Sequence, residues 1–350
     1  MLRRTFLLST AATAASTVLA SVGCSNKDKQ PETSPETSHQ ATNKTSTSAM
    51  PNTTNPSTTT RSFGPTVAGR FYTDNANSLR SEVRSYLDIA ANTAATIPEN
   101  QHIIAIVAPH AGYMYSGTVA GTAFASIPST HAREINTVAI LSPSHHASRP
   151  YVCSLPADSY RTPLGETPMA RSLINSLMEK GDMVRNDEAI FRPEHAIDVE
   201  IPFIQLAFPS AQIIPLIVPM MSITRLEEFG RLLFETIGEN PNSLVVTSTD
   251  LSHFFSYEKA RAIDEAIVSE LEQNNTKAAF EAHDERRGPC GIAPIIATWS
   301  YARYAAQKFQ KTHAENSPFH VHRLAIKNSG DALPSGRDRV VGYCAMALTV

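Results

Sequence analysis

Residues 103–117 read IIAIVAPHAGYMYSG, and the interpretation of the whole chain starts from this stretch. Its first five residues, Ile103 to Val107, are apolar and partly β-branched, which is typical of a buried strand. The chain then runs through two more residues into His110, so this histidine follows the carboxyl end of the strand. Ligands bind at that edge of open α/β sheets, because loops there bring side chains from several strands to one point.

Two later segments repeat this design. The strand predicted over residues 137–141 ends in the loop SPSHH, which carries His145 and a second histidine after it. The strand predicted over residues 244–247 delivers Asp250 and His253. A single histidine after a strand is more often a structural residue than a ligand. Three strand ends that each carry such a side chain favour a shared site, and the three together predict a metal centre or an active site.

Strand and helix patterns alternate along the remaining sequence. Residues 212–218 (QIIPLIV) predict a further buried strand, and the spacing of apolar residues predicts helices over 79–89, 169–180, 223–237, 257–271 and 292–309. Two closing strands are predicted at 320–327 and 339–349. This alternation predicts an α/β fold: a single domain with a central mixed, largely parallel sheet flanked by helices.

Length and composition restrict the classes of function. A chain of 350 residues with 42% hydrophobic residues is long enough to bury one large core. Its formal net charge of -3 gives no basic surface for a nucleic acid. The four cysteines, at positions 24, 153, 290 and 344, are too scattered for a disulfide scaffold or a paired zinc motif. Cys153 and Cys344 would pair only if their Cα atoms lay within about 7 Å.

The N-terminal residues 1–24 have the features of an export signal, with a basic start, an apolar stretch and small residues before Cys24. Arg3-Arg4 resembles a twin-arginine signal, and an ordinary secretory signal is the alternative. The ending Val22-Gly23-Cys24 resembles a bacterial lipobox, although Ser21 replaces the usual leucine. Residues 25–61 are rich in Ser, Thr, Pro and Asn, which predicts a disordered tether to a domain over 62–350. We therefore expect an exported protein, lipid-anchored at Cys24 in the bacterial cell envelope.

Five motifs carry a family resemblance. They are APHAGYMYSG, LSPSHH, EHAIDVEIPF, TSTDLSHF and PCGIAP. In this order and spacing they resemble the Memo family, also called AmmeMemoRadiSam system protein B, over residues 66–350. The resemblance implies a metal held by His110, His145 and Cys290, and a fold similar to the class III extradiol dioxygenases, which use non-haem iron. It therefore implies iron as cofactor, with copper or zinc as alternatives, and metal-dependent oxidation as the reaction class. Family members often have a histidine where Val67 stands.

Other residues near these motifs are predicted to support the site. Asp250 and His253 would act as an acid–base pair or orient the metal ligands, unless they cap a following helix. His195 is expected at the pocket edge, with Glu194 and Asp198 on one face if this segment is helical. A helix dipole at Cys290 would stabilise its thiolate, whereas the alternative is a small buried side chain. Tyr113 and Tyr115 in the loop after His110 either line a pocket or pack on the core.

Three functions stay open at this stage. The first is an iron- or copper-dependent redox enzyme of the oxygenase type. The second is hydrolysis with Cys290 as nucleophile and His145 or His253 as base. The third is a non-catalytic lipoprotein that binds a metal or a peptide. The only predicted membrane contact is the N-terminal lipid.

Overall fold

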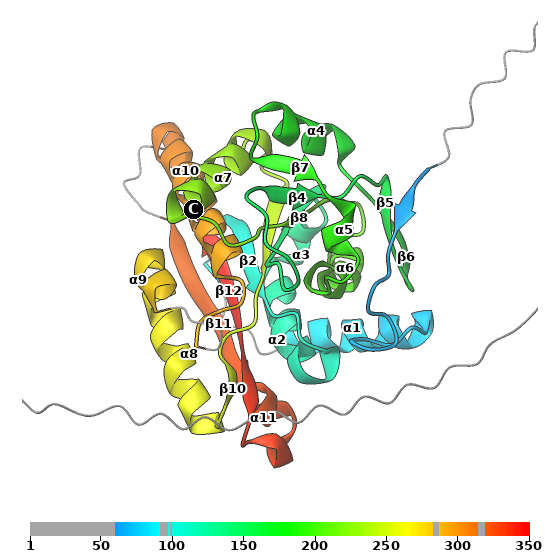
Figure 1. Cartoon of the computed structure of the whole chain (residues 1–350), viewed down its shortest axis with the longest axis vertical. Helices are drawn as coiled ribbons and strands as arrows, with labels where there is room; N and C mark the ends of the chain where they lie inside the picture. Colours follow the sequence, from blue (N-terminus) through cyan, green and yellow to red (C-terminus); the bar gives the residue numbers. More distant parts are fainter. Residues whose placement is uncertain (1–59, 92–96, 99, 283–286, 314–318) are drawn as a thin grey trace, which may run out of the picture. The chain divides into compact units, whose positions relative to one another are not determined.

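The structure, a computed structural model, describes residues 60–91, 97–98, 100–282, 287–313 and 319–350 (Figure 1). The predicted export signal with Cys24, and nearly all of the predicted tether, lie outside these residues. Among the described residues, no helix has both the length and the apolar character needed to cross a bilayer.

A nine-stranded sheet forms the centre of the domain. Its order is β10-β12-β2-β9-β3-β8-β4-β7, and β11 pairs with β12 outside this path. The four middle strands are parallel to one another: β2 (Ile103–Ala108), β9 (Ser243–Ser248), β3 (Thr137–Ser142) and β8 (Gln212–Ile217). The strands outside them are β4 (Val152–Ser154), β7 (Val184–Asn186), β10 (His253–Phe255), β11 (His320–Asn328) and β12 (Val340–Thr349). The prediction of an α/β domain with a central mixed sheet is confirmed, although the sheet has as many antiparallel as parallel pairings.

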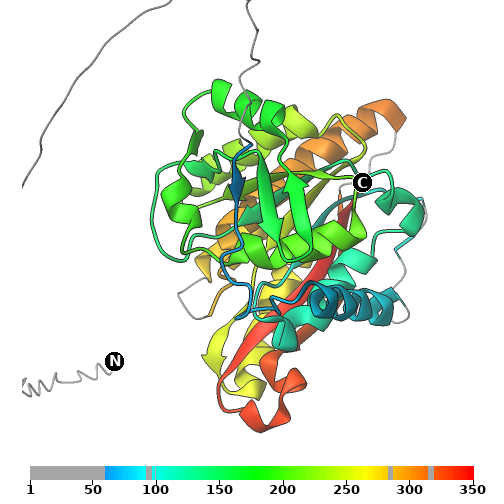
Figure 2. The same cartoon turned by 90° about the vertical axis from the view of Figure 1, so that its right-hand side faces the viewer.

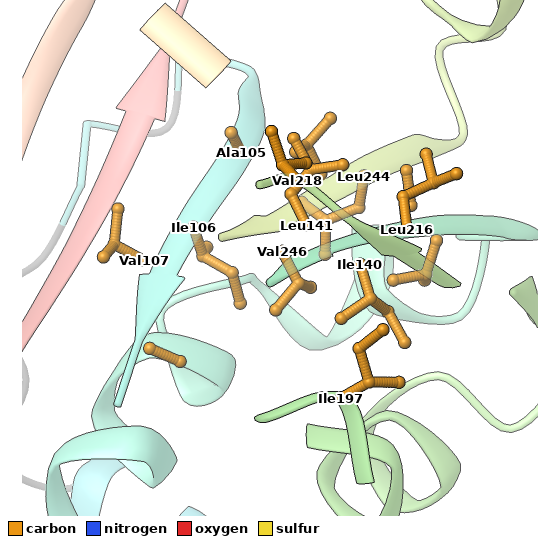
Figure 3. Packing of buried hydrophobic residues seen from close by; sticks show 14 of the residues in the cluster. Ala105, Ile106, Val107, Ile140, Leu141, Ile197, Leu216, Val218, Leu244 and Val246 are labelled. Carbon is orange, nitrogen blue, oxygen red and sulfur yellow. The ribbon is translucent and has the colours of Figure 1, made fainter. Parts of the chain in front are cut away.

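The middle strands are buried because their sequences are apolar on both faces. Every residue of β2, β3 and β9 is buried, as is every residue of β8 after the first. Figure 3 shows side chains of these strands, among them Ile106, Ile140 and Val246, packed with Ile197 from a neighbouring helix. Each fully buried aliphatic side chain stabilises the fold by about 1.5–3 kcal/mol. The carboxyl ends of four parallel strands therefore meet at one rigid edge.

Helices cover both faces of this sheet (Figure 1). On one face lie α1 (Ala76–Ala91), α2 (Tyr113–Ala125) and α6 (Ala196–Ala207). On the other lie α7 (Ile223–Ile237), α8 (Tyr257–Glu272), α9 (Thr276–Glu281) and α10 (Ile292–His313). Shorter elements complete the described part: α3 (Ser129–Ala132), α4 (Arg171–Glu179), α5 (Glu188–Phe191), α11 (Ser329–Ala332) and η1 (Pro334–Gly336).

A small second sheet joins the first described strand to the domain. It has the order β1-β5-β6, with β1 (Ser62–Phe63) parallel to β5 (Ser159–Thr162) and β6 (Gly165–Pro168) antiparallel to β5. Figure 2 shows this sheet on the side of the domain that carries α1 and α6. It brings residues that follow β1 to the amino end of α6, which becomes important at the site.

The prediction of a loop at Tyr113 and Tyr115 is wrong, because α2 begins at Tyr113 itself. Gly117, which suggested a loop, and Gly121 instead let α2 approach α1 closely. A Cβ at Gly117 would stand 2.4 Å from the ring of Tyr86, and one at Gly121 would stand 2.6 Å from the backbone oxygen of Tyr86. The buried Tyr113 donates a hydrogen bond to the backbone oxygen of Val199 on α6 at 2.7 Å. Tyr113 therefore packs on the core, whereas Tyr115 is partly exposed.

The pairing of Cys153 with Cys344 is excluded by the sheet order. Both cysteines are buried and free. Cys153 lies on β4 and Cys344 on β12, five strand positions apart. Neighbouring strands are about 4.8 Å apart, so roughly 24 Å separates the two cysteines, far beyond the reach of a disulfide.

The contact between α7 and α10 depends on Gly230. A Cβ at this position would stand 2.2 Å from the backbone oxygen of Ala297. We expect Gly230→Ala to lower the free energy of unfolding by about 1–3 kcal/mol, because the backbone of α10 cannot yield as a side chain would. Gly336→Ala is the matched control, since its Cβ would meet no atom within 4 Å. Urea unfolding measures both variants, and equal stability of the two would contradict this account of the interface.

Candidate metal centre

Three predicted metal ligands lie together at the carboxyl edge of the sheet. His110 follows β2, His145 follows β3, and Cys290 precedes α10 by two residues. The donor atoms of these three side chains all lie within 4.8 Å of one another. Cys290 Sγ is 3.2 Å from His110 Nε2, and the two imidazole centroids are 5.2 Å apart. Two imidazoles and a thiol arranged in this way can hold one metal ion.

His145 is held by a glutamate that the sequence interpretation did not assign to it. Its backbone N–H donates to Glu194 Oε2 at 2.9 Å, and its Nδ1 lies 2.9 Å from Glu194 Oε1. The same carboxylate also accepts the N–H groups of His195 and Ala196. Burial by itself raises the pKa of Glu194, but His145 and these donors outweigh it and lower the pKa to about 2. An ionised carboxylate fixes the proton of His145 on Nδ1 and leaves the Nε2 lone pair free for a metal.

His110 is also oriented through its Nδ1. Nδ1 lies 2.8 Å from Ser248 Oγ, and the backbone N–H of His110 donates to Asp250 Oδ1 at 2.9 Å. The ring is completely buried, and burial followed by the charges of His145 and His195 keeps its pKa well below the ordinary value. A neutral imidazole whose Nε2 faces Cys290 is the form that a metal requires. The donor set therefore fits a metal ion.

Burial has the largest effect on the protonation of the Cys290 thiol. It raises the pKa of the thiol, and the charge of Asp250 raises it further, against a backbone N–H of Asp250 that lies 3.2 Å from Sγ. Cys290 lies two residues before α10, as predicted, and desolvation of its thiol opposes the thiolate in the metal-free protein. Only a cation at the centre would remove the proton, since coordinated thiols are deprotonated.

The predicted catalytic residues surround this cluster. The ring of His195 stacks on His145 with centroids 4.7 Å apart, and it meets His110 edge-on at 5.2 Å. Burial lowers the pKa of His195 to about 4 and that of His253 below its ordinary value, so both imidazoles are neutral at pH 7. His253 lies on β10, close enough for its charge to act on His110. Neutral imidazoles beside a metal centre can accept a proton from a bound substrate.

Asp250 contacts a metal ligand through the backbone and belongs to the buried interior. Its carboxylate accepts the N–H of His110, and burial raises its pKa to about 7. Neither Asp250 nor His253 caps the next helix, because α8 begins after Ser256. Both residues lie beside the cluster, where Asp250 can hold the backbone of His110 in place.

Glu194 and Asp198 do not act at one point, contrary to the prediction from their helical spacing. Glu194 precedes α6, since His195 occupies the N-cap position, and it turns back to His145. Asp198 accepts the backbone N–H groups of Thr66 and Val67 and the hydroxyl of Tyr72. It therefore ties the segment after β1 to α6. Phe71 of that segment contacts His195, with ring centroids 4.7 Å apart.

An exposed aromatic ring lies next to His253. Phe254 is 52% exposed and has a φ of 65°, in the left-handed region that a phenylalanine rarely adopts. The register of β10 against β12 is irregular at this residue. Bulges of this kind redirect side chains beside active sites, and here the Phe254 ring lies 5.7 Å from the His253 ring. The guanidinium of Arg339 lies 5.1 Å from the same ring.

The buried acids predict an unusual pH dependence for the metal-free protein. Burial raises the pKa of Glu200 to about 8 and that of Asp250 to about 7, so the folded state binds more protons than the unfolded state between about pH 5 and 8. Stability must then decrease as the pH rises through this range. Buried histidines with lowered pKa values oppose the trend only below about pH 6.5. We expect a higher melting temperature at pH 6.5 than at pH 8.5, and a flatter profile for Glu200→Gln. A melting temperature that rises with pH would contradict this.

Comparison with known proteins identifies relatives of this sequence. A family profile described as "Memo-like protein" matches residues 64–347. The chain is 30% identical over 285 residues to a "MEMO1 family protein" of Methanosarcina mazei, covering 81% of this chain and 97% of that protein. It is 30% identical over 288 residues to one of Methanococcoides burtonii, covering 81% and 98%, and 28% identical over 292 residues to one of Sulfolobus acidocaldarius, covering 81% and 97%.

Proposed function

This chain belongs to the Memo family, and from that premise we propose that His110, His145 and Cys290 hold one transition-metal ion in a redox enzyme of the oxygenase type. The observation that carries the proposal is the convergence of three donor atoms within 4.8 Å. Hydrogen bonds on the far side of both rings leave the two Nε2 atoms for the metal. Three protein ligands leave coordination positions for a substrate or for oxygen, which is the arrangement of a catalytic site.

Iron is the metal that we propose, with copper or zinc as alternatives. Two imidazoles and one thiolate suit each of these ions. We prefer iron because the fold is predicted to be similar to that of the class III extradiol dioxygenases, which use non-haem iron. Bound iron would supply redox chemistry, which no side chain of this cluster supplies by itself. Around it, His195 and His253 would take a proton from the substrate, and Asp250 would hold the backbone of His110 in place.

The rival hydrolase has less support. A catalytic cysteine needs a depressed pKa and a base beside it. Burial raises the pKa of Cys290, and the ring nitrogen at 3.2 Å belongs to His110 and not to the predicted bases His145 and His253. A metal-binding role explains both features, because a cation would replace the thiol proton and bring Cys290 and His110 to the same ion.

Two measurements test the proposal. The first is the metal content of the protein purified from its own cells, where about one iron per chain is expected. The second is oxygen consumption by the iron-loaded protein with a panel of catechols and thiols. Turnover supports the enzyme. Tight metal binding without turnover of any compound supports the alternative, a non-catalytic metal- or peptide-binding lipoprotein, and the absence of bound metal would overturn the assignment of the centre.

We further propose that the protein is exported and anchored in the cell envelope by a lipid on Cys24. The support is the Arg3-Arg4 signal, the Val22-Gly23-Cys24 ending and the polar composition of residues 25–61. Cell fractionation and mass analysis of the intact protein test it. We expect a lipid-modified protein that lacks residues 1–23 in the membrane fraction, whereas a soluble protein that keeps these residues would contradict the anchor.

A further inference from the structure

Helix α6 carries a buried acid that the centre described so far does not use. Glu200 is completely buried within a helix segment that is otherwise apolar apart from Asp198. Its Oε1 accepts the hydroxyl of Ser248 at 2.6 Å. Its Oε2 has no hydrogen-bond partner within the described part of the chain. A buried carboxyl group with half of its hydrogen-bonding capacity unused is costly, so its retention calls for a role.

Ser248 connects this acid to a metal ligand. It is the last residue of β9, and its Oγ lies 2.8 Å from His110 Nδ1. A serine hydroxyl has a single proton, and an ionised carboxylate can only accept one. When Glu200 is ionised, Ser248 donates to it, and the serine oxygen is then left to accept the Nδ1 proton of His110. His110 is thereby held with its Nε2 lone pair directed toward Cys290 Sγ, 3.2 Å away.

The opposite direction of the hydrogen bonds between Glu200, Ser248 and His110 would prevent His110 from binding a metal. If a proton donor replaced the carboxylate, Ser248 would accept from it and donate to Nδ1 of His110. The imidazole proton would then lie on Nε2, the atom that must bind the metal. Both histidines of the centre would thus depend on a glutamate: His145 on Glu194 directly, and His110 on Glu200 through a serine.

We propose that Glu200 is a positioning residue of the metal centre, which sets the tautomer of His110 through Ser248. This inference rests on the proposed function, because it assigns the residue to a centre that binds metal. Two other titratable groups are coupled to Glu200: Asp250, whose charge acts on it, and the Tyr113 hydroxyl, on which Glu200 acts. Among the described residues, the hydrogen-bond partner of His110 Nδ1 is Ser248.

The first test reads the tautomer without any metal. The nitrogen chemical shifts of His110 are measured by NMR in the metal-free protein at pH 9, above the pKa of about 8 to which burial raises Glu200. Wild type is expected to carry the proton on Nδ1. Glu200→Gln and Ser248→Ala are expected to shift His110 toward the Nε2-protonated form. If neither variant changed the tautomer of His110, the proposal that Glu200 acts on His110 through Ser248 would be wrong, whether or not the protein binds a metal.

The second test measures metal affinity at pH 9, where Glu200 is ionised, by competition with a chelator, using iron and then zinc. Ser248→Ala and Glu200→Gln are expected to weaken binding by about 10- to 100-fold, the usual effect of losing a partner behind a metal ligand. Ser248→Thr keeps the hydroxyl and is expected to recover part of the affinity. Affinities within about twofold of wild type in both disabling variants would contradict the proposal, whereas wild-type protein that binds no metal would refute the proposed function alone.

Thr247→Val is the matched control for a loss of packing. Thr247 precedes Ser248 on β9, is equally buried, and shares a hydrogen bond of 2.6 Å with Thr298 of α10. Its removal deletes a buried hydroxyl contact from the same strand without touching His110. This variant is expected to lose stability but to keep the His110 tautomer and the metal affinity. If it changed both as strongly as Ser248→Ala, the effects would reflect general disturbance of β9, and the proposal would be refuted.

Discussion

Cys290→Ser is expected to abolish metal binding. The sulfur lies 3.2 Å from His110 Nε2, and it is one of three donor atoms, from His110, His145 and Cys290, that lie within 4.8 Å of one another. A serine hydroxyl stays protonated at neutral pH and cannot supply the anionic ligand that the thiolate provides. The carboxylate of Asp250 is already engaged by the N–H of His110. We expect His110→Ala and His145→Ala to lose the metal as well.

The measurement is metal content per chain after purification, with two kinds of comparison. Cys153→Ser is the matched control, because it removes a buried free cysteine on β4 that is not one of the clustered donor residues. It is expected to retain full metal. Asp250→Asn is expected to weaken binding only by about 10- to 100-fold. If Cys290→Ser kept its metal while Asp250→Asn lost it, the ligand set would be wrong, and an oxygen-rich site of two histidines and one carboxylate would replace it.

Asp198→Ala is expected to be among the most destabilising single changes in the domain. The carboxylate is fully buried and accepts hydrogen bonds from Thr66 N, Val67 N and the Tyr72 hydroxyl at 2.6–2.9 Å. Burial raises its pKa, although these donors oppose the shift. Alanine would leave buried donors without a partner, and each such group costs about 1–3 kcal/mol. We therefore expect a loss of roughly 2–5 kcal/mol in the free energy of unfolding.

Asp198→Ala should also affect the metal centre. The segment that Asp198 holds includes Phe71, whose ring contacts His195 and whose backbone oxygen accepts the N–H of Tyr113. We expect a moderately lower metal affinity together with the lower stability, measured by chelator competition and by urea unfolding. The exposed Asp74 on the same segment provides the control, since its replacement by alanine should change stability by less than about 0.5 kcal/mol. Equal stability of the two variants would contradict the anchoring role.

Much of the fold was predictable because its strongest signals are local. Continuous apolar runs such as residues 103–107 can be satisfied only by burial on both faces, and the structure makes them the parallel middle of the sheet. The helix predicted over 223–237 is α7, and the two closing strands are β11 and β12. The start of α2 at Tyr113 was missed, because Gly112 and Gly117 suggest a loop unless the close approach of Tyr86 to Gly117 is known.

The candidate site was predictable to the extent that strand ends predict it. His110, His145 and Asp250 each follow a parallel strand, so their approach to one edge is a consequence of topology. Cys290 was assigned through the family resemblance, and the structure brings its sulfur to His110. Glu194 and Glu200 were not assigned to the histidines, although one signal was present: acids in a segment whose other residues are mostly apolar are seldom buried without a partner.

The sequence by itself determined the α/β class, the membership of the family and the residue types that approach the sheet edge, because these depend on local burial patterns and on motifs. The tertiary structure alone decided which side chains meet. It directs Glu194 to His145 and Asp198 to Thr66, although one helical turn separates the two acids in sequence. It also separates Cys153 from Cys344 and raises the pKa of Cys290 by burial. Such pairings depend on packing between distant segments, and hydrogen bonds and desolvation act over a few ångströms in space regardless of sequence separation.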